Sequence, residues 1–147
     1  MVSATRVQRT TGEDPAAREL LGRITAEWTP LYGPQLRGDP AAIFPADLPH
    51  YVALIEDDRP VAGGGLRPLG DGIAEVKRMY VVPERRGQGL ARRLLGELEA
   101  LARDAGYVAL RLDSAGALDA FYVSAGFVEI PDYNGNRHAR FWAERAL

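Results

Sequence analysis

Apolar residues recur along the chain with two different periods, and the period predicts the type of each element. Alternating short, apolar and charged side chains predict a first strand over residues 3–8. From Asp14 onward, apolar residues recur every three or four positions, which predicts a helix with one apolar stripe that ends at Gly33 and Pro34. The stripe consists of Ala17, Leu20, Leu21, Ile24 and Trp28.

The segment over residues 33–49 is rich in proline, with Pro34, Pro40, Pro45 and Pro49. Proline lacks a backbone N–H and blocks a continuing helix. We therefore expect an ordered loop that holds at most a short helix around residues 40–44. A loop of this length in a compact domain is often functional.

Three strands are predicted next, over residues 51–56, 61–67 and 73–82. Asp, Gly and Pro residues between them have the chemistry of tight turns. The consecutive glycines 63–65 indicate a bulge or close packing, with contact to a ligand as the alternative. Alternation in the third strand fails over residues 79–82, which a bulge or burial on both faces would explain.

A strong amphipathic helix follows over residues 89–105 and ends at Gly106. The remaining predicted elements are a strand over 107–112, a short helix over 117–124, and strands over 127–130 and 140–144. This order predicts an α/β fold with a mixed sheet of the α+β kind. An antiparallel N-terminal meander is followed by a βαβ unit.

Composition narrows the classes of function. The 147 residues suit one domain over residues 1–147. The absence of cysteine excludes disulfides and thiolate metal sites. A net charge of −2 argues against a nucleic-acid partner, and no apolar run suits a membrane span or a secretory leader, so we expect a cytoplasmic protein. Lys77 is the only lysine.

The junction between the third meander strand and the amphipathic helix combines small and basic residues. It reads Arg86, Gly87, Gln88, Gly89, Leu90, Ala91, Arg92. Free N–H groups and the dipole at a helix start attract anions, so the junction fits a pyrophosphate; a tight turn without a ligand is the alternative. A P-loop would need Gly-Lys-Ser/Thr, and a dinucleotide fingerprint would need glycine in place of Arg92.

This junction resembles a known motif. Arg86-x-x-Gly89-x-Ala91 is similar to the R/Q-x-x-G-x-G/A motif of the GCN5-related N-acetyltransferase (GNAT) superfamily, which binds the pyrophosphate of acetyl-CoA. Residues 121–127 (FYVSAGF) resemble its second signature, and the likeness spans residues 51–130. The resemblance implies a GNAT-like fold whose sheet splays between strands 4 and 5. It also implies acetyl-CoA as cosubstrate, no metal, and direct transfer to a primary amine of a small molecule or peptide.

The resemblance assigns the catalytic roles to two side chains. It implies Tyr122 as the general acid that protonates the leaving thiolate. It implies Glu75 as the base that accepts the proton of the amine, directly or through water. The alternative for Glu75 is an edge charge paired with Lys77 or Arg78.

The resemblance also implies which residues bind the cosubstrate and the acceptor. The backbone of Met79, Tyr80 and Val81 would receive the pantetheine arm, with one N–H for the thioester oxygen. The junction residues Arg86, Gly87, Gln88, Gly89, Leu90, Ala91 and Arg92 would hold the pyrophosphate. The acceptor cleft would be lined by Trp28, Tyr32, Tyr133 and His138. Ala115 departs from the family, because many members have asparagine there.

Two other functions remain open at this stage. One is a non-catalytic acyl-CoA sensor or interaction module, and the other is a domain for a different phosphorylated ligand. The aromatic residues Tyr133, Phe141 and Trp142 could form the seam of a homodimer.

Overall fold

The computed structural model describes residues 4–147, and its elements follow the predicted order. They are β1 (Arg6–Thr10), α1 (Pro15–Tyr32), β2 (His50–Glu56), β3 (Arg59–Gly70), β4 (Ile73–Val81), α2 (Leu90–Asp104), β5 (Ala109–Ser114), α3 (Asp119–Ser124), β6 (Val128–Glu129) and β7 (Phe141–Ala146). Ser3, the expected start of the first strand, lies outside the described residues. The predicted mixture of an antiparallel meander and a βαβ unit is confirmed.

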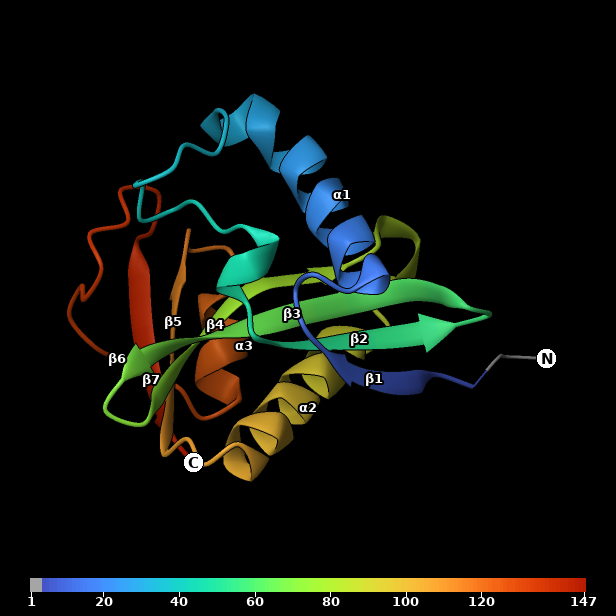
Figure 1. The fold of residues 1–147 in the computed structure, drawn as a ribbon. Coiled ribbons are helices and arrows are strands. Elements are labelled where there is room, and N and C mark those ends of the chain that lie inside the picture. Colours follow the sequence, from blue (N-terminus) through green and yellow to red (C-terminus); the bar gives the residue numbers. More distant parts are fainter. Residues whose placement is uncertain (1–3) are drawn as a thin grey trace.

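The strands form one seven-stranded sheet in the order β1-β2-β3-β4-β5-β7-β6. The first four pair antiparallel as a meander, and β5 joins β4 in parallel after the crossover through α2. The last strand, β7, pairs antiparallel with both β5 and β6. The sheet is therefore mixed, with its single parallel step in the middle (Figure 1).

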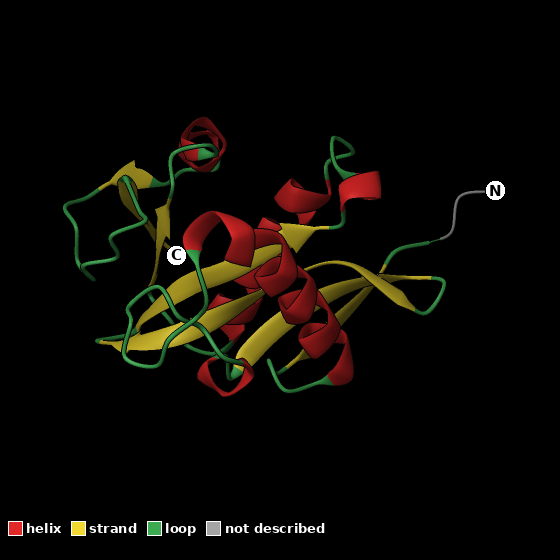
Figure 2. Cartoon of the chain, turned by 90° about the horizontal axis from the view of Figure 1, so that it is seen from above, coloured by secondary structure: helices red, strands yellow, loops and turns green. Residues whose placement is uncertain are grey.

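Helices cover both faces of the sheet. In Figure 1, α1 lies above the meander and α2 lies below it. Figure 2 shows the molecule from above, with helices in red crossing the yellow strands of the sheet. Strand β2 is consequently buried on both sides. Val52 and Leu54 join the core formed with α2, whereas Tyr51, Ala53 and Ile55 join the core formed with α1. Such double burial explains its run of apolar residues.

Several boundaries differ from the sequence prediction, and two of these differences have a clear local cause. The turn between β2 and β3 needs only Asp57 and Asp58, whose φ angles are 49° and 60°, so β3 begins at Arg59, two residues earlier than expected, while β2 ends at Glu56 as predicted. Short hairpins favour such positive φ angles because they match the strand twist. The short helix expected around residues 40–44 lies instead at Pro45–Asp47 as a 3₁₀ turn. Proline suits the first position of a helical turn, where its missing N–H has no partner to lose.

The three consecutive glycines of β3 allow close packing, which was expected from the sequence as the alternative to contact with a ligand. A Cβ atom on Gly63 would lie 2.4 Å from the Tyr51 hydroxyl, and one on Gly65 would lie 2.7 Å from Leu48 Cδ1. A Cβ on Gly64 would lie 3.1 Å from Met79 Cγ. The glycines therefore let a helix, a loop and a neighbouring strand approach one backbone closely.

The aromatic residues near the C-terminus pack within the chain. Phe141 is buried in the core, and Trp142 Nε1 donates to Asn134 Oδ1 at 3.0 Å. Of the three residues expected to form a homodimer seam, Phe141 is buried, whereas Tyr133 and Trp142 stay half-buried, and the seam remains a prediction. Across residues 4–147, no helix combines the length and the apolar character that crossing a bilayer requires.

Substitution of Gly63 tests the packing of β3. We expect Gly63→Ala to lower the free energy of unfolding by about 1–3 kcal/mol, because its methyl group would overlap Tyr51 and Leu20. Gly96→Ala, on α2 with open space around its Cβ, should raise it by about 0.5–1 kcal/mol. Urea unfolding of both variants measures the difference. Equal effects of the two substitutions would contradict the packing role of Gly63.

Candidate active site

A bulge interrupts β4 beside the central glycine of β3. Gly63 pairs with Tyr80 and Gly65 pairs with Lys77, so Arg78 and Met79 together oppose Gly64. Arg78 adopts a φ of 57°, a conformation that costs a non-glycine residue about 1–3 kcal/mol. The bulge accounts for the failed alternation and confirms that expectation.

Strands β4 and β5 separate immediately before this bulge. Their parallel pairing covers only Ile73–Glu75 against Ala109–Arg111, although β4 continues to Val81 and β5 to Ser114. The predicted splay between strands 4 and 5 is confirmed. A cavity of about 350 Å³ opens at this position, between α1, the following loop, the two separated strands, α3 and residues 136–139.

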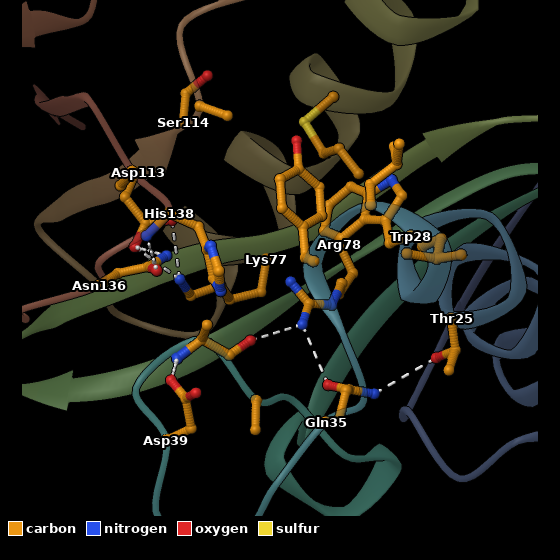
Figure 3. Close-up of a pocket in the computed structure, with 18 of the residues that line it drawn as sticks. Thr25, Trp28, Gln35, Asp39, Lys77, Arg78, Asp113, Ser114, Asn136 and His138 are labelled. Atoms are coloured by element: carbon orange, nitrogen blue, oxygen red, sulfur yellow. Dashed lines mark hydrogen bonds and ion pairs between the residues drawn. The ribbon is translucent and has the colours of Figure 1, made fainter.

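One wall of the cavity is aromatic and consists of Trp28, Tyr32 and His138, of which Figure 3 labels Trp28 and His138. The rings of Trp28 and Tyr32 meet edge to face with centroids 6.0 Å apart, and Tyr32 lies 5.2 Å from the ring of His138. All three residues line the cavity, as the prediction of an acceptor cleft requires. The wall joins α1 to the loop before β7, two segments more than 100 residues apart in the sequence.

A buried ion pair lies between the separated strands. Lys77 Nζ on β4 lies 3.0 Å from both carboxylate oxygens of Asp113 on β5. Asn134 and Asn136 donate to the same carboxylate, at 2.6 and 3.2 Å. Burial alone would raise the pKa of Asp113, but the charge of Lys77 and these hydrogen bonds outweigh it and lower the pKa below its usual range. Asp113 therefore stays ionised.

Glu75 lies next to this pair but outside the cavity. Its side chain is fully buried; Oε1 accepts from Arg67 at 2.6 Å, and Oε2 accepts from the Tyr133 hydroxyl at 2.5 Å and from Asn134 at 3.2 Å. Lys77 lies 3.5 Å away, so the expected alternative of an ion pair with Lys77 is present. A base that contacts the amine directly needs an open oxygen, and Glu75 has none.

The same contact changes the expectation for Tyr133. Its hydroxyl is bound to Glu75, and burial together with the Glu75 charge raises its pKa. Its ring lies under the Arg111 guanidinium, 5.3 Å away, and is absent from the cavity lining. Tyr133 therefore belongs to the buried network instead of the acceptor cleft.

Tyr122 reaches the cavity from α3. The side chain is buried in the core, and burial, followed by the charges of Asp113 and Asp119, raises its pKa to about 12. Its hydroxyl has no hydrogen-bond partner among residues 4–147. A protonated, unengaged phenol at a cavity wall is available to donate a proton.

The predicted anion loop lies beyond the bulge and leads into α2. Gly87 and Gly89 have φ angles of 78° and 83°, and no atom lies within 4 Å of a Cβ built on either. Gly89 is the N-cap of α2, and no side chain caps this helix start. The first N–H groups of a 15-residue helix are thus open to an anion.

Arginine side chains around the loop are held by the chain itself. Arg86 donates to the Val81 carbonyl at 2.9 Å and lies over the Tyr80 ring at 5.3 Å. Arg92 donates to Ser124 Oγ at 2.9 Å. Their guanidinium groups brace the loop against the end of β4 and against α3. The open element of the loop is therefore its backbone, as the predicted anion site requires.

Of the residues expected to hold the cofactor arm, Met79 lines the cavity, while the Tyr80 side chain packs into the core on the α1 side. Ser114 and Ala115 line the cavity at the end of β5. Sequence reasoning missed Arg78 and Asp113 as cavity residues. The failed alternation marked the position of Arg78, but it did not indicate which way the side chain would point.

Comparison with known proteins gives one family match and three similar solved structures. Residues 47–129 match the acetyltransferase (GNAT) domain family. A candidate acyl-CoA N-acyltransferase from Klebsiella pneumoniae is 25% identical, with a TM-score of 0.74 over 97% of each chain. The PaiA N-acetyltransferase of Thermoplasma acidophilum, in complex with coenzyme A, is 18% identical, with a TM-score of 0.68 over 98% of this chain and 99% of that one. A GNAT-family acetyltransferase from Staphylococcus aureus Mu50 is 15% identical, with a TM-score of 0.73 over 96% and 99%.

Removal of the Asp113 charge tests the buried pair. A depressed folded-state pKa contributes stability that is complete above the unfolded value of about 4 and is lost as the pH falls through the folded value. We expect Asp113→Asn to lower the free energy of unfolding at pH 7 by about 3–5 kcal/mol, because Lys77 loses its main counter-charge. The variant should also lose less stability than the wild type between pH 4 and pH 2 (about two units below the unfolded value).

Asp104→Asn is the matched control, since Asp104 forms an exposed ion pair with Arg9. It should change the free energy of unfolding by about 1 kcal/mol or less. Denaturant titrations at a series of pH values measure both effects. Parallel pH curves for the wild type and Asp113→Asn would contradict the assigned role of the pair.

Proposed function

Since the chain belongs to the GNAT acetyltransferase family and is an acyl-CoA-dependent acyltransferase, we propose that it transfers an acetyl group from acetyl-CoA to a primary amine of a small molecule or peptide. One observation carries this proposal. The cavity at the splay of β4 and β5 holds a free phenol on one side and an aromatic wall on the other. An open helix N-terminus lies on the same connection out of β4.

The open loop fits the cosubstrate. Gly87 and Gly89 leave room for a phosphate to reach the backbone, and the uncapped N–H groups of Leu90, Ala91 and Arg92 supply donors. The bulged segment Met79, Tyr80 and Val81 has no strand partner on the β5 side, which leaves that edge for an extended arm. When bound, acetyl-CoA supplies the acetyl thioester.

Tyr122 is the proposed general acid. Its raised pKa keeps the hydroxyl protonated at neutral pH, and the hydroxyl has no partner within the described part of the chain that would compete for the proton. Donation to the departing sulfur leaves a tyrosinate that bulk water can reprotonate through the cavity.

The acceptor would enter along the aromatic wall of Trp28, Tyr32 and His138. This wall faces the separated strands, so an amine placed there and a thioester along β4 would share one cavity. Such an arrangement favours direct attack within a ternary complex, because no covalent enzyme intermediate is needed when both substrates are held together.

We propose that Glu75 positions other side chains and does not act as the expected base. Its carboxylate holds Arg67, Tyr133 and Lys77 and so fixes the strand that carries the bulge. We assign it a positioning role, in which the proton of the amine leaves through the cavity instead of through Glu75.

The anion loop is tested by Gly89→Asp. We expect acetyl-CoA affinity to fall by about 100-fold, because a carboxylate would occupy the helix start and repel the pyrophosphate. Gly70→Asp is the control, since Gly70 also has a positive φ of 93° and open space around it. Calorimetric titration with acetyl-CoA, and with acetylpantetheine, which lacks the pyrophosphate, measures the effect. Unchanged affinity in Gly89→Asp would refute the loop assignment.

Tyr122→Phe tests the general acid. We expect kcat to fall by about 100-fold or more, because the phenyl ring keeps the packing and removes the proton donor. Affinity for acetyl-CoA should not change. Tyr107→Phe, outside the cavity lining, controls for loss of a hydroxyl elsewhere. Thiol release from acetyl-CoA in the presence of an amine library provides the assay.

The two readouts separate the possible failures. Full kcat in Tyr122→Phe would remove Tyr122 from the mechanism. Binding of acetyl-CoA by the wild type without transfer to any amine would indicate a sensor or interaction module instead of an enzyme.

A further inference from the structure

Arg78 is the one cavity cation that lacks a carboxylate partner within residues 4–147. Lys77 is paired with Asp113 and Glu75, and its charge is compensated twice. Arg137, which is outside the cavity lining, lies 3.6 Å from the lining residue Asp39. Arg78 has no carboxylate within ion-pair distance, although its guanidinium is largely buried.

The guanidinium of Arg78 is held firmly at one end. Nη2 donates to the Ala41 carbonyl at 2.7 Å and to Gln35 Oε1 at 3.1 Å, and the group lies 4.9 Å from the Trp28 ring centroid (Figure 3). Arginine has five N–H donors, and these bonds use only Nη2. The Nε and Nη1 donors have no hydrogen-bond partner among the described residues.

The backbone also fixes this side chain. Arg78 is the bulge residue with a φ of 57°, and the bulge turns its side chain toward α1 and the following loop. A strained backbone at a cavity wall commonly marks a residue whose side-chain position matters. Burial lowers the pKa of Arg78 to about 10, so the group remains cationic at neutral pH.

A buried cation with free donors favours an anionic ligand. A carboxylate matches the planar fork of a guanidinium and can accept two parallel hydrogen bonds. Without such a ligand, the guanidinium contacts a carbonyl, an amide oxygen and an aromatic face, and the carboxylates of Asp113 and Glu75 act on it only from beyond ion-pair distance. Arg78 is therefore the lining cation whose free donors are open to an anionic ligand.

Building on the proposed function, we propose that the acceptor is an amine that also carries a carboxylate, as free amino acids do, and that Arg78 binds this carboxylate. The aromatic wall of Trp28, Tyr32 and His138 would then contact the remainder of the acceptor. Arg78 becomes the residue that selects zwitterionic or acidic amines over neutral and polycationic ones.

Paired acceptors test this specificity. The common L-amino acids and their α-carboxamides differ only in the charged group, and each pair is assayed for acetyl transfer by the wild type. We expect the best carboxylate acceptor to exceed its carboxamide in kcat/KM by about 10- to 100-fold, the range of a charge-assisted hydrogen-bonded pair. Equal kcat/KM values within pairs, or faster transfer to carboxamides, would overturn the proposal while leaving the acetyltransferase function intact.

Gln35→Glu tests the role of Arg78 without removing it. Its Oε1 already accepts from Arg78 and from the Ile43 N–H, so glutamate would supply a carboxylate inside the chain and keep these two contacts, losing only the exposed bond that Nε2 donates to Thr25. We expect this variant to lose the preference for carboxylate acceptors, chiefly through KM, with acetyl-CoA affinity unchanged. Arg78→Gln should lose the same preference. Arg103→Gln, an exposed arginine on α2, should retain it.

A failure of the enzyme itself is distinguishable. If no amine is acetylated, calorimetric titration of the acetyl-CoA-loaded chain with the same amino acids decides the question. Binding by the wild type that is lost in Gln35→Glu supports the Arg78 site, and absence of binding by the wild type contradicts it. Retained preference in both Gln35→Glu and Arg78→Gln would also contradict it.

Discussion

The ion pair between Lys77 and Asp113 links β4 to β5 at the point where the two strands no longer pair through their backbones. Backbone hydrogen bonds between β4 and β5 stop at Glu75, so a different tie must set the distance between the two strands beyond that point. Lys77 spans the gap by donating to both oxygens of Asp113. The same carboxylate accepts from Asn134 and Asn136, which anchors the loop that carries His138. Beyond Glu75 the two strands are thus linked through side chains in place of backbone hydrogen bonds, and the cavity lies between them.

The bulge in β4 depends on the glycines of β3. Two residues of β4 fit opposite Gly64 because Gly64 has no side chain to collide with Met79. Gly63 and Gly65 allow Tyr51 and Leu48 to pack against the same strand from the other side. A rigid, closely packed β3 thus supports the strain at Arg78. Close packing of the glycine-rich strand β3 therefore maintains the strained backbone of Arg78 and fixes the position of its side chain.

The sequence predicts elements better than it predicts side-chain partners. Periodicity gave the order of all strands and helices, because burial of one face is a local property of α1 and α2. The open loop at Gly87 and Gly89 was also predictable, since glycine spacing before a helix constrains the backbone directly. The partners of Glu75 were not predictable: Tyr133 lies 58 positions away and reaches Glu75 only through the order of strands in the sheet. Arg78 was missed as a cavity residue because a bulge reverses the side to which later residues point.

The single lysine has a chemical consequence for a protein that handles activated acetyl groups. Thioesters acetylate exposed, neutral amines without any catalyst, and surface lysines are the usual targets. Here the only ε-amino group in the sequence is 4% exposed and lies in ion pairs with two carboxylates. Arginine supplies every other basic side chain, and a guanidinium at neutral pH is not a nucleophile. The surface of the described chain therefore resists adventitious acylation of lysine, and the bond that organises its interior is chemically protected from its own cosubstrate.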